Sequence, residues 1–119
     1  MLIRNYEAAD LSLIAYMLGK DLHVSVFGGD VPHIGAVSVW DPDAGEVKAI
    51  SLPGHKEQVI TDKIARAVGT GANVRICVEA GMHYDHFSKE VLNQVEWAAD
   101  RIIEDLLQYY KFQAESQGM

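Results

Sequence analysis

A change from strand to helix is predicted at Ser51-Leu52-Pro53-Gly54-His55-Lys56-Glu57. These residues separate an alternating apolar run (residues 47–52) from a segment with helical periodicity (residues 59–68). Proline and glycine end the strand, so we expect a helix to begin near His55. The first N–H groups of a helix lack internal partners and carry partial positive charge. With His55 and Lys56 beside them they predict a cradle for an anion, although an ordinary turn can have the same composition.

The composition is that of one globular domain, residues 1–119, in which 113–119 resembles a frayed tail. Of the 119 residues, 49% are apolar and 23% are charged, which is ordinary for a single hydrophobic core. The net charge is −7 and the basic residues are scattered, which argues against nucleic acid as a partner. The sequence shows neither a signal peptide nor an apolar window long enough to cross a membrane, so we expect a cytoplasmic protein.

Five strands and two helices follow from the spacing of the apolar residues. Four strands precede the turn at 51–57, and a fifth lies between the helices. The class is therefore α+β or α/β, with a single five-stranded mixed sheet in the chain order β-β-β-β-α-β-α and two helices packed on one face. A homodimer would bury the other face. The expected strands are 11–18, 22–27, 34–40, 47–52 and 74–78, and the expected helices are 55–68 and 89–112.

Strand direction predicts that three loops with unusual composition share one edge of the sheet. Antiparallel neighbours exchange ends at each turn, and a crossover through a helix returns the chain in the direction of the strand before it. The loops at 28–33, 51–57 and 81–86 should therefore meet. Glycines there allow backbone to approach a ligand, and ligands often bind at the carboxyl ends of strands.

This edge predicts a site for a phosphate-bearing or otherwise anionic small molecule, with Tyr84 or Met82 stacking on a flat ring. A metal ion is an alternative, bound by His33, His55 and His83 with Asp30 or Asp85, although the spacing is not that of a compact metal motif. We assign no catalytic residue, because Ser51 and the single cysteine, Cys77, have no placed base. The candidate binding residues are Gly28, Gly29, His33, Gly54, His55, Lys56, Gly81, His83 and Tyr84.

Three segments together resemble the prenylated-flavin chaperone family, LpdD-like, over residues 6–107. They are Gly28-Gly29-Asp30-Val31-Pro32-His33-Ile34-Gly35, Ser51-Leu52-Pro53-Gly54-His55-Lys56-Glu57 and Ala80-Gly81-Met82-His83-Tyr84-Asp85. Members of this family are small D subunits that accompany gallate- and vanillate-type decarboxylases.

The resemblance implies a non-enzymatic role beside a UbiD-type decarboxylase. Such a protein holds reduced prenylated FMN, made by a flavin prenyltransferase, as cargo and helps to load or mature it in the decarboxylase. Loop geometry places the phosphate on Gly54, His55 and Lys56 and the ring system near His33, His83 and Tyr84. Two alternatives remain: a small metal-dependent hydrolase or isomerase that uses the loop histidines, and a purely structural accessory subunit.

Overall fold

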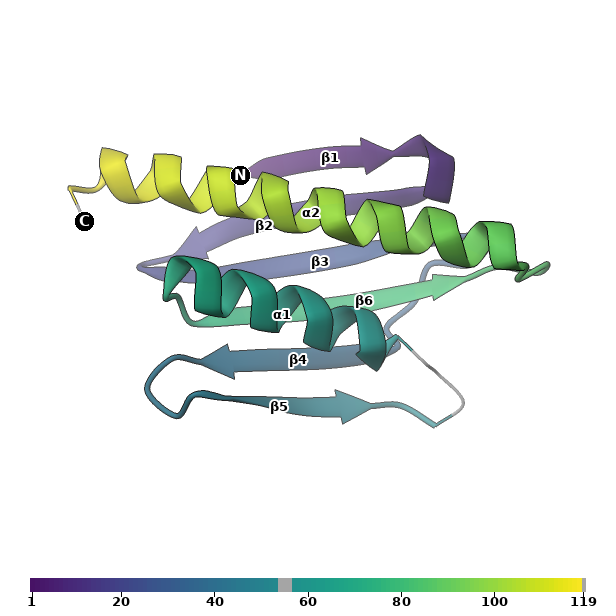
Figure 1. The fold of residues 1–119 in the computed structure, drawn as a ribbon, viewed down its shortest axis with the longest axis horizontal. Coiled ribbons are helices and arrows are strands. Elements are labelled where there is room, and N and C mark those ends of the chain that lie inside the picture. Colours follow the sequence, from purple (N-terminus) through teal and green to yellow (C-terminus); the bar gives the residue numbers. More distant parts are fainter. Residues whose placement is uncertain (54–56, 119) are drawn as a thin grey trace.

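Two helices cover one face of a single six-stranded sheet (Figure 1). The computed structural model describes residues 1–53 and 57–118. The strands are β1 (Leu2–Tyr6), β2 (Leu11–Leu18), β3 (Asp21–Gly29), β4 (Ala36–Asp41), β5 (Glu46–Ser51) and β6 (Ile76–His83). The helices are α1 (Gln58–Ala72), α2 (Lys89–Ser116) and the short 3-10 helix η1 (Glu7–Ala9). The predicted α+β class with a mixed sheet and two main helices is confirmed.

The predicted number of strands is wrong, because β1 forms a sixth strand antiparallel to β2. Only Leu2 and Tyr6 of β1 are buried, and the three residues between them are exposed. Arg4 occupies the position between Leu2 and Tyr6 on the side where an apolar residue would mark a strand. The alternation that identifies a half-buried strand is therefore missing from this segment.

The sheet order is β1-β2-β3-β6-β4-β5, so β6 lies between β3 and β4. Strand β6 runs parallel to β3 and antiparallel to β4. We expected β3 and β4 to be antiparallel neighbours joined by the loop at 28–33, and this is wrong because β6 lies between them. The strand directions are nevertheless those predicted, because β3, β5 and β6 all end, and β4 begins, at the same edge.

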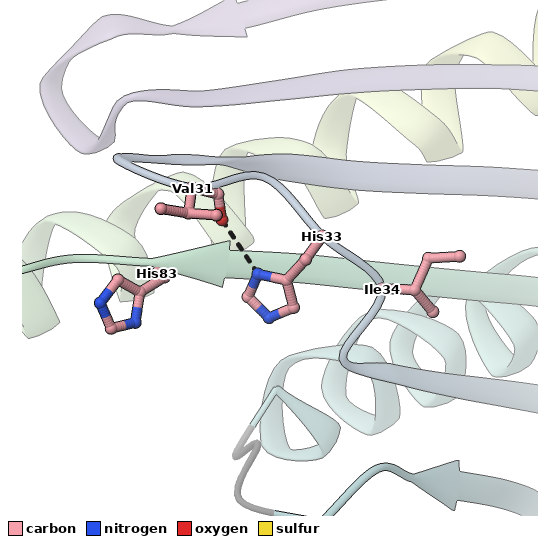
Figure 2. A pocket seen from close by; sticks show the side chains of 4 residues that line it. All are labelled: Val31, His33, Ile34 and His83. Atoms are coloured by element: carbon pink, nitrogen blue, oxygen red, sulfur yellow. Dashed lines mark hydrogen bonds between the residues drawn. The ribbon is translucent and has the colours of Figure 1, made fainter.

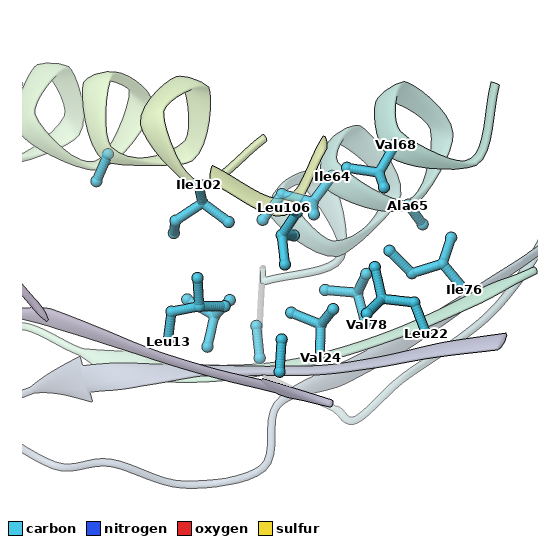
Figure 3. Packing of buried hydrophobic residues seen from close by; sticks show 14 of the residues in the cluster. Leu13, Leu22, Val24, Ile64, Ala65, Val68, Ile76, Val78, Ile102 and Leu106 are labelled. Carbon is cyan, nitrogen blue, oxygen red and sulfur yellow. The ribbon is translucent and has the colours of Figure 1, made fainter. Parts of the chain in front are cut away.

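The core lies between the sheet and the two helices (Figure 3). Alternate residues of β2 and β3, including Leu13, Leu22 and Val24, are fully buried beneath Ile64 of α1 and Ile102 of α2. Full burial of one such side chain contributes about 1.5–3 kcal/mol. This alternation leaves the intervening residues of each strand on the face opposite the helices.

The helix ends agree only in part with the sequence. Ser88 caps α2, since its hydroxyl accepts a hydrogen bond from the Val91 N–H at 3.2 Å. Helix α2 continues to Ser116, and α1 continues to Ala72, where Asn73 in the left-handed conformation ends it. Neither helix of the described chain combines the length and apolar character needed to cross a membrane.

Candidate functional site

Three segments that are far apart in the sequence meet at the rim where β3 and β6 end. Gly29 at the end of β3 pairs with His83 at the end of β6. Ala36, the first residue of β4, pairs with Ala80 of β6 and with Ser51 at the end of β5. The predicted convergence of these loops is confirmed for the described residues. Gly54, His55 and Lys56, which were assigned to the anion cradle, lie outside the described residues.

The glycines at this rim make room for backbone. A Cβ atom on Gly81 would overlap the carbonyl group of His33, and one on Gly29 would overlap the carbonyl group of His83. Gly29 also has a φ of +72°, a conformation that other residues rarely adopt. Sequence reasoning assigned these glycines to close approach of a ligand. In the structure, neighbouring protein backbone fills the space beside them.

The connection at residues 30–35 crosses β6 on the face turned away from the helices. Ala80 is fully buried in the core, so Gly81 faces the opposite side, where it meets the His33 carbonyl. Figure 2 shows this connection passing in front of β6 before it enters β4. The crossing places the His33 side chain beside that of His83.

A shallow pocket of about 380 Å³ opens at this crossing, lined by Val31, His33, Ile34 and His83 (Figure 2). This volume is near the lower end of the range for ligand sites. Val31 and Ile34, which sequence analysis did not select, are 54% and 62% exposed although both are aliphatic. Their sequence signal was the presence of two aliphatic residues around Pro32-His33 in a loop otherwise rich in polar residues and glycine.

Hydrogen-bond chemistry determines the protonation of His33. Its Nδ1 lies 2.9 Å from the Val31 carbonyl oxygen, and its Nε2 lies 2.8 Å from Oε2 of Glu57. A carbonyl and a carboxylate can only accept, so both ring nitrogens carry hydrogen when Glu57 is ionised. The bond to Val31, joined by the charges of Glu57 and Glu79, raises the pKa of His33. The raised pKa favours the protonated ring, in which neither nitrogen has a lone pair to offer a metal ion.

Glu57 is a third residue of the site that sequence analysis did not select, after Val31 and Ile34. Only 8% of Glu57 is exposed, and its carboxylate pairs with His33. Gly35 leaves space for this carboxylate, which a Cβ atom at that position would overlap. The contact ties the 30–35 connection to the start of α1 across 24 positions of sequence. A pattern in the local sequence does not predict an ion pair between residues so far apart in the chain.

A second histidine and carboxylate lie on the other side of the pocket. Nε2 of His83 is 3.4 Å from Oδ1 of Asp85, and both side chains are more than half exposed. The Asp85 N–H donates to Oδ2 of Asp30 at 2.8 Å, which holds the turn after β6 against the end of β3. Each histidine of the described pocket is therefore paired with a carboxylate, and a phosphate placed beside it would meet like charge.

Tyr84 does not line the pocket. Its hydroxyl donates to the Ala9 carbonyl at 2.6 Å, and its ring packs against the core. Burial, with the nearby charges of Asp10 and Asp30, raises the pKa of Tyr84 to about 12. Gly28, also a predicted site residue, packs against the carbonyl of Asp10. These two residues support the rim from the side of η1.

The described residues, 1–53 and 57–118, contain no group of three His, Cys, Asp or Glu side chains that could hold a metal ion. Of the predicted metal ligands, His33 is bonded at both nitrogens and His83 pairs with Asp85, while His55 lies outside this part of the chain. The described pocket thus offers two aliphatic side chains and two imidazole rings, of which that of His33 has a raised pKa.

The sequence matches the model of a known protein family. The model of the family described as prenylated flavin chaperone LpdD-like domain matches residues 5–111. The chain belongs to this family. No curated protein matches it.

Membership of the LpdD-like family confirms the resemblance carried by the three loop segments. The match begins at Asn5 in β1 and ends inside α2. It therefore includes strands β2 to β6 and the four residues that line the pocket. The family description connects the chain with prenylated flavin and with a chaperone role.

Proposed function

We propose that this protein is a non-enzymatic chaperone that binds reduced prenylated FMN as cargo and helps to load or mature it in a UbiD-type aromatic acid decarboxylase. A flavin prenyltransferase would supply the cargo. The observation that carries the proposal is the family match over residues 5–111. The rim pocket, where His33 and His83 lie beside two exposed aliphatic side chains, supports it by offering a surface for a flat ring system.

The charges around the pocket favour one orientation of the cargo. Glu57 pairs with His33, and Asp85, whose N–H is bonded to Asp30, pairs with His83, so we place the doubly negative phosphate elsewhere. The sequence offers Gly54, His55 and Lys56 for it, next to Glu57 in the chain. The ring system then contacts Val31 and Ile34, with the His33 cation near an electron-rich reduced ring.

Co-elution of reduced prenylated FMN with the protein under anaerobic conditions tests this proposal. We expect wild-type protein to retain the flavin absorbance on gel filtration. His83→Ala should lower retention about tenfold, because it removes one wall of the pocket. Lys56→Ala should lower it similarly through the phosphate. His86→Ala is the matched control, since this exposed histidine does not line the pocket, and it should behave as wild type.

If both His83→Ala and Lys56→Ala retained the flavin as well as wild type does, the rim would not be the flavin-binding site. Transfer is measured separately, as the gain of decarboxylase activity when apo-decarboxylase is mixed with the loaded protein. A purely structural accessory subunit would instead bind the decarboxylase equally well with every rim histidine replaced.

The proposal also includes self-association as a homodimer, because the described helices cover only one face of the sheet. Such a dimer would hold its cargo in the cytoplasm, where the prenyltransferase and the decarboxylase are expected.

A further inference from the structure

The uncovered face of the sheet has a polar centre. On this face His23 of β3 lies beside Cys77 of β6, and Ser25 lies beside Glu79. These four side chains, here called the central square, face away from the helices because Leu22, Val24 and Val78, which alternate with them, are buried in the core. The square is surrounded by larger, mainly apolar side chains, namely Ile14 and Tyr16 of β2, Val37 and Val39 of β4, and Phe27 farther along β3.

Two atoms of the central square are buried without a hydrogen bond. They are Nδ1 of His23 and Oε2 of Glu79, for which the described chain supplies no partner. The other carboxylate oxygen, Oε1, accepts from the Ser25 hydroxyl at 2.9 Å. The Tyr16 ring stacks on His23 with 5.0 Å between ring centroids. An unsatisfied buried polar atom costs about 1–3 kcal/mol, so one donor and one acceptor on the same face call for a shared partner.

We propose that a second copy of this chain covers the face, and that His23 of each copy donates a hydrogen bond to Glu79 of the other. The inference rests on the self-association proposed above and not on flavin binding. In a two-fold interface, if one residue contacts another, the reverse contact also forms. Each copy has one unpaired nitrogen, Nδ1 of His23, and one unpaired carboxylate oxygen, Oε2 of Glu79. Self-association therefore forms two equivalent hydrogen bonds, which satisfy all four atoms of the dimer. This self-complementarity selects a second copy over an unrelated protein.

The arrangement of the square fixes where the two-fold axis runs. His23 and Glu79 occupy one diagonal, and Ser25 and Cys77 occupy the other. An axis along the second diagonal exchanges the positions of His23 and Glu79 between copies. The same axis places Cys77 of one copy opposite Cys77 of the other. Sheets that face each other pack about 10 Å apart. The two thiols should therefore lie within reach of a short cross-linker.

Mass and cross-linking test the face directly. Wild-type protein should sediment at twice the 13.1 kDa of one chain. A short bis-maleimide should join two copies through Cys77, which is the only cysteine. The control variant Cys77→Ser/Glu96→Cys carries its thiol on the exposed side of α2 and should remain unlinked at the same protein concentration. A monomeric wild type, or a dimer that Cys77 does not link, would overturn the proposal.

A matched pair of substitutions separates this face from the rest of the surface. Tyr16 is 38% exposed on the proposed interface, and Leu92 is 40% exposed on α2. Tyr16→Asp should give monomer, because it places a charge among apolar side chains, whereas Leu92→Asp should remain dimeric. Equal dimerisation of the two variants would show that another face is used.

Exchange of the polar partners tests the contact itself and does not depend on how Tyr16→Asp folds. His23→Glu places two carboxylates against each other and should weaken self-association at least about tenfold. Glu79→His leaves two imidazoles in contact and should also weaken it. When the two variants are mixed, each contact again joins one histidine and one glutamate, so a mixed dimer should form in preference to either homodimer. Absence of that preference would contradict the pairing, whatever the outcome of flavin binding.

Discussion

At the scale of single residues, the protonation of His33 gives a prediction about pH. The bond to the Val31 carbonyl and the charge of Glu57 raise its pKa above the ordinary value of 6.5. Because the folded-state pKa is the higher one, protonated His33 stabilises the fold fully below about pH 6.5. This contribution is lost as the pH rises through the folded-state pKa.

Wild type should therefore exceed His33→Gln in free energy of unfolding by about 1 kcal/mol at pH 6, and the difference should shrink as the pH rises. Urea denaturation at a series of pH values measures this difference. His86→Gln serves as control and should follow wild type throughout. An NMR titration that placed the His33 pKa at or below 6.5 would contradict the assigned bonds.

At the scale of elements, two glycines in the last turns of α1 are predicted to respond in opposite ways to the same substitution. Alanine favours a helix by about 1 kcal/mol over glycine. A Cβ atom on Gly69, however, would overlap the ring of Trp40, which is only 8% exposed. At Gly71 the nearest atom is the flexible end of Leu107, 3.1 Å away.

Gly69→Ala should consequently destabilise the fold by about 1–2 kcal/mol, since overpacking outweighs the helix preference. Gly71→Ala should be neutral or stabilise by about 0.5 kcal/mol, because the Leu107 side chain can shift. Chemical denaturation of both variants provides the comparison. Stabilisation by both substitutions would show that the Trp40 ring can move aside.

Local sequence pattern was sufficient for the elements whose periodicity is regular. The three-and-four repeat of α2 and the alternation of β2 and β3 predicted their type and faces. Strand β1 was missed because the exposed Arg4 stands between Leu2 and Tyr6, where alternation requires an apolar residue. The insertion of β6 between β3 and β4 was not predicted either. The order of non-consecutive strands depends on tertiary packing and does not change the local periodicity of the sequence.

The site was predictable to the extent that it depends on strand direction. Direction alone brought His33 and His83 to one rim. The partners of His33 were not predictable, because Glu57 lies 24 positions away and its burial follows from the way α1 packs. Tyr84 was assigned to the pocket from its place in the loop, whereas its ring turns to bond Ala9. Sequence position therefore located the rim but not the orientation of its side chains.

At the scale of the whole molecule, the proposed cargo site and the proposed dimer face lie on the same side of the sheet but use different residues. The pocket is formed by the 30–35 connection and the end of β6, within one chain. The dimer contact uses His23 and Glu79, nearer the middle of their strands. Glu79 acts on both sites, because its charge also raises the pKa of His33. The two sites otherwise use different residues, so the free energies of stabilisation by cargo and by self-association should nearly add.

Thermal unfolding can measure both effects. The midpoint of wild type should rise with protein concentration, because a second copy binds only the folded chain, whereas that of Tyr16→Asp should not. Reduced prenylated FMN at 100 times its Kd should stabilise each protein by about 2.7 kcal/mol. Leu92→Asp should follow wild type in both respects. If Tyr16→Asp lost the flavin effect together with the concentration effect, the two sites would be coupled, and the pocket would need the second copy to be complete.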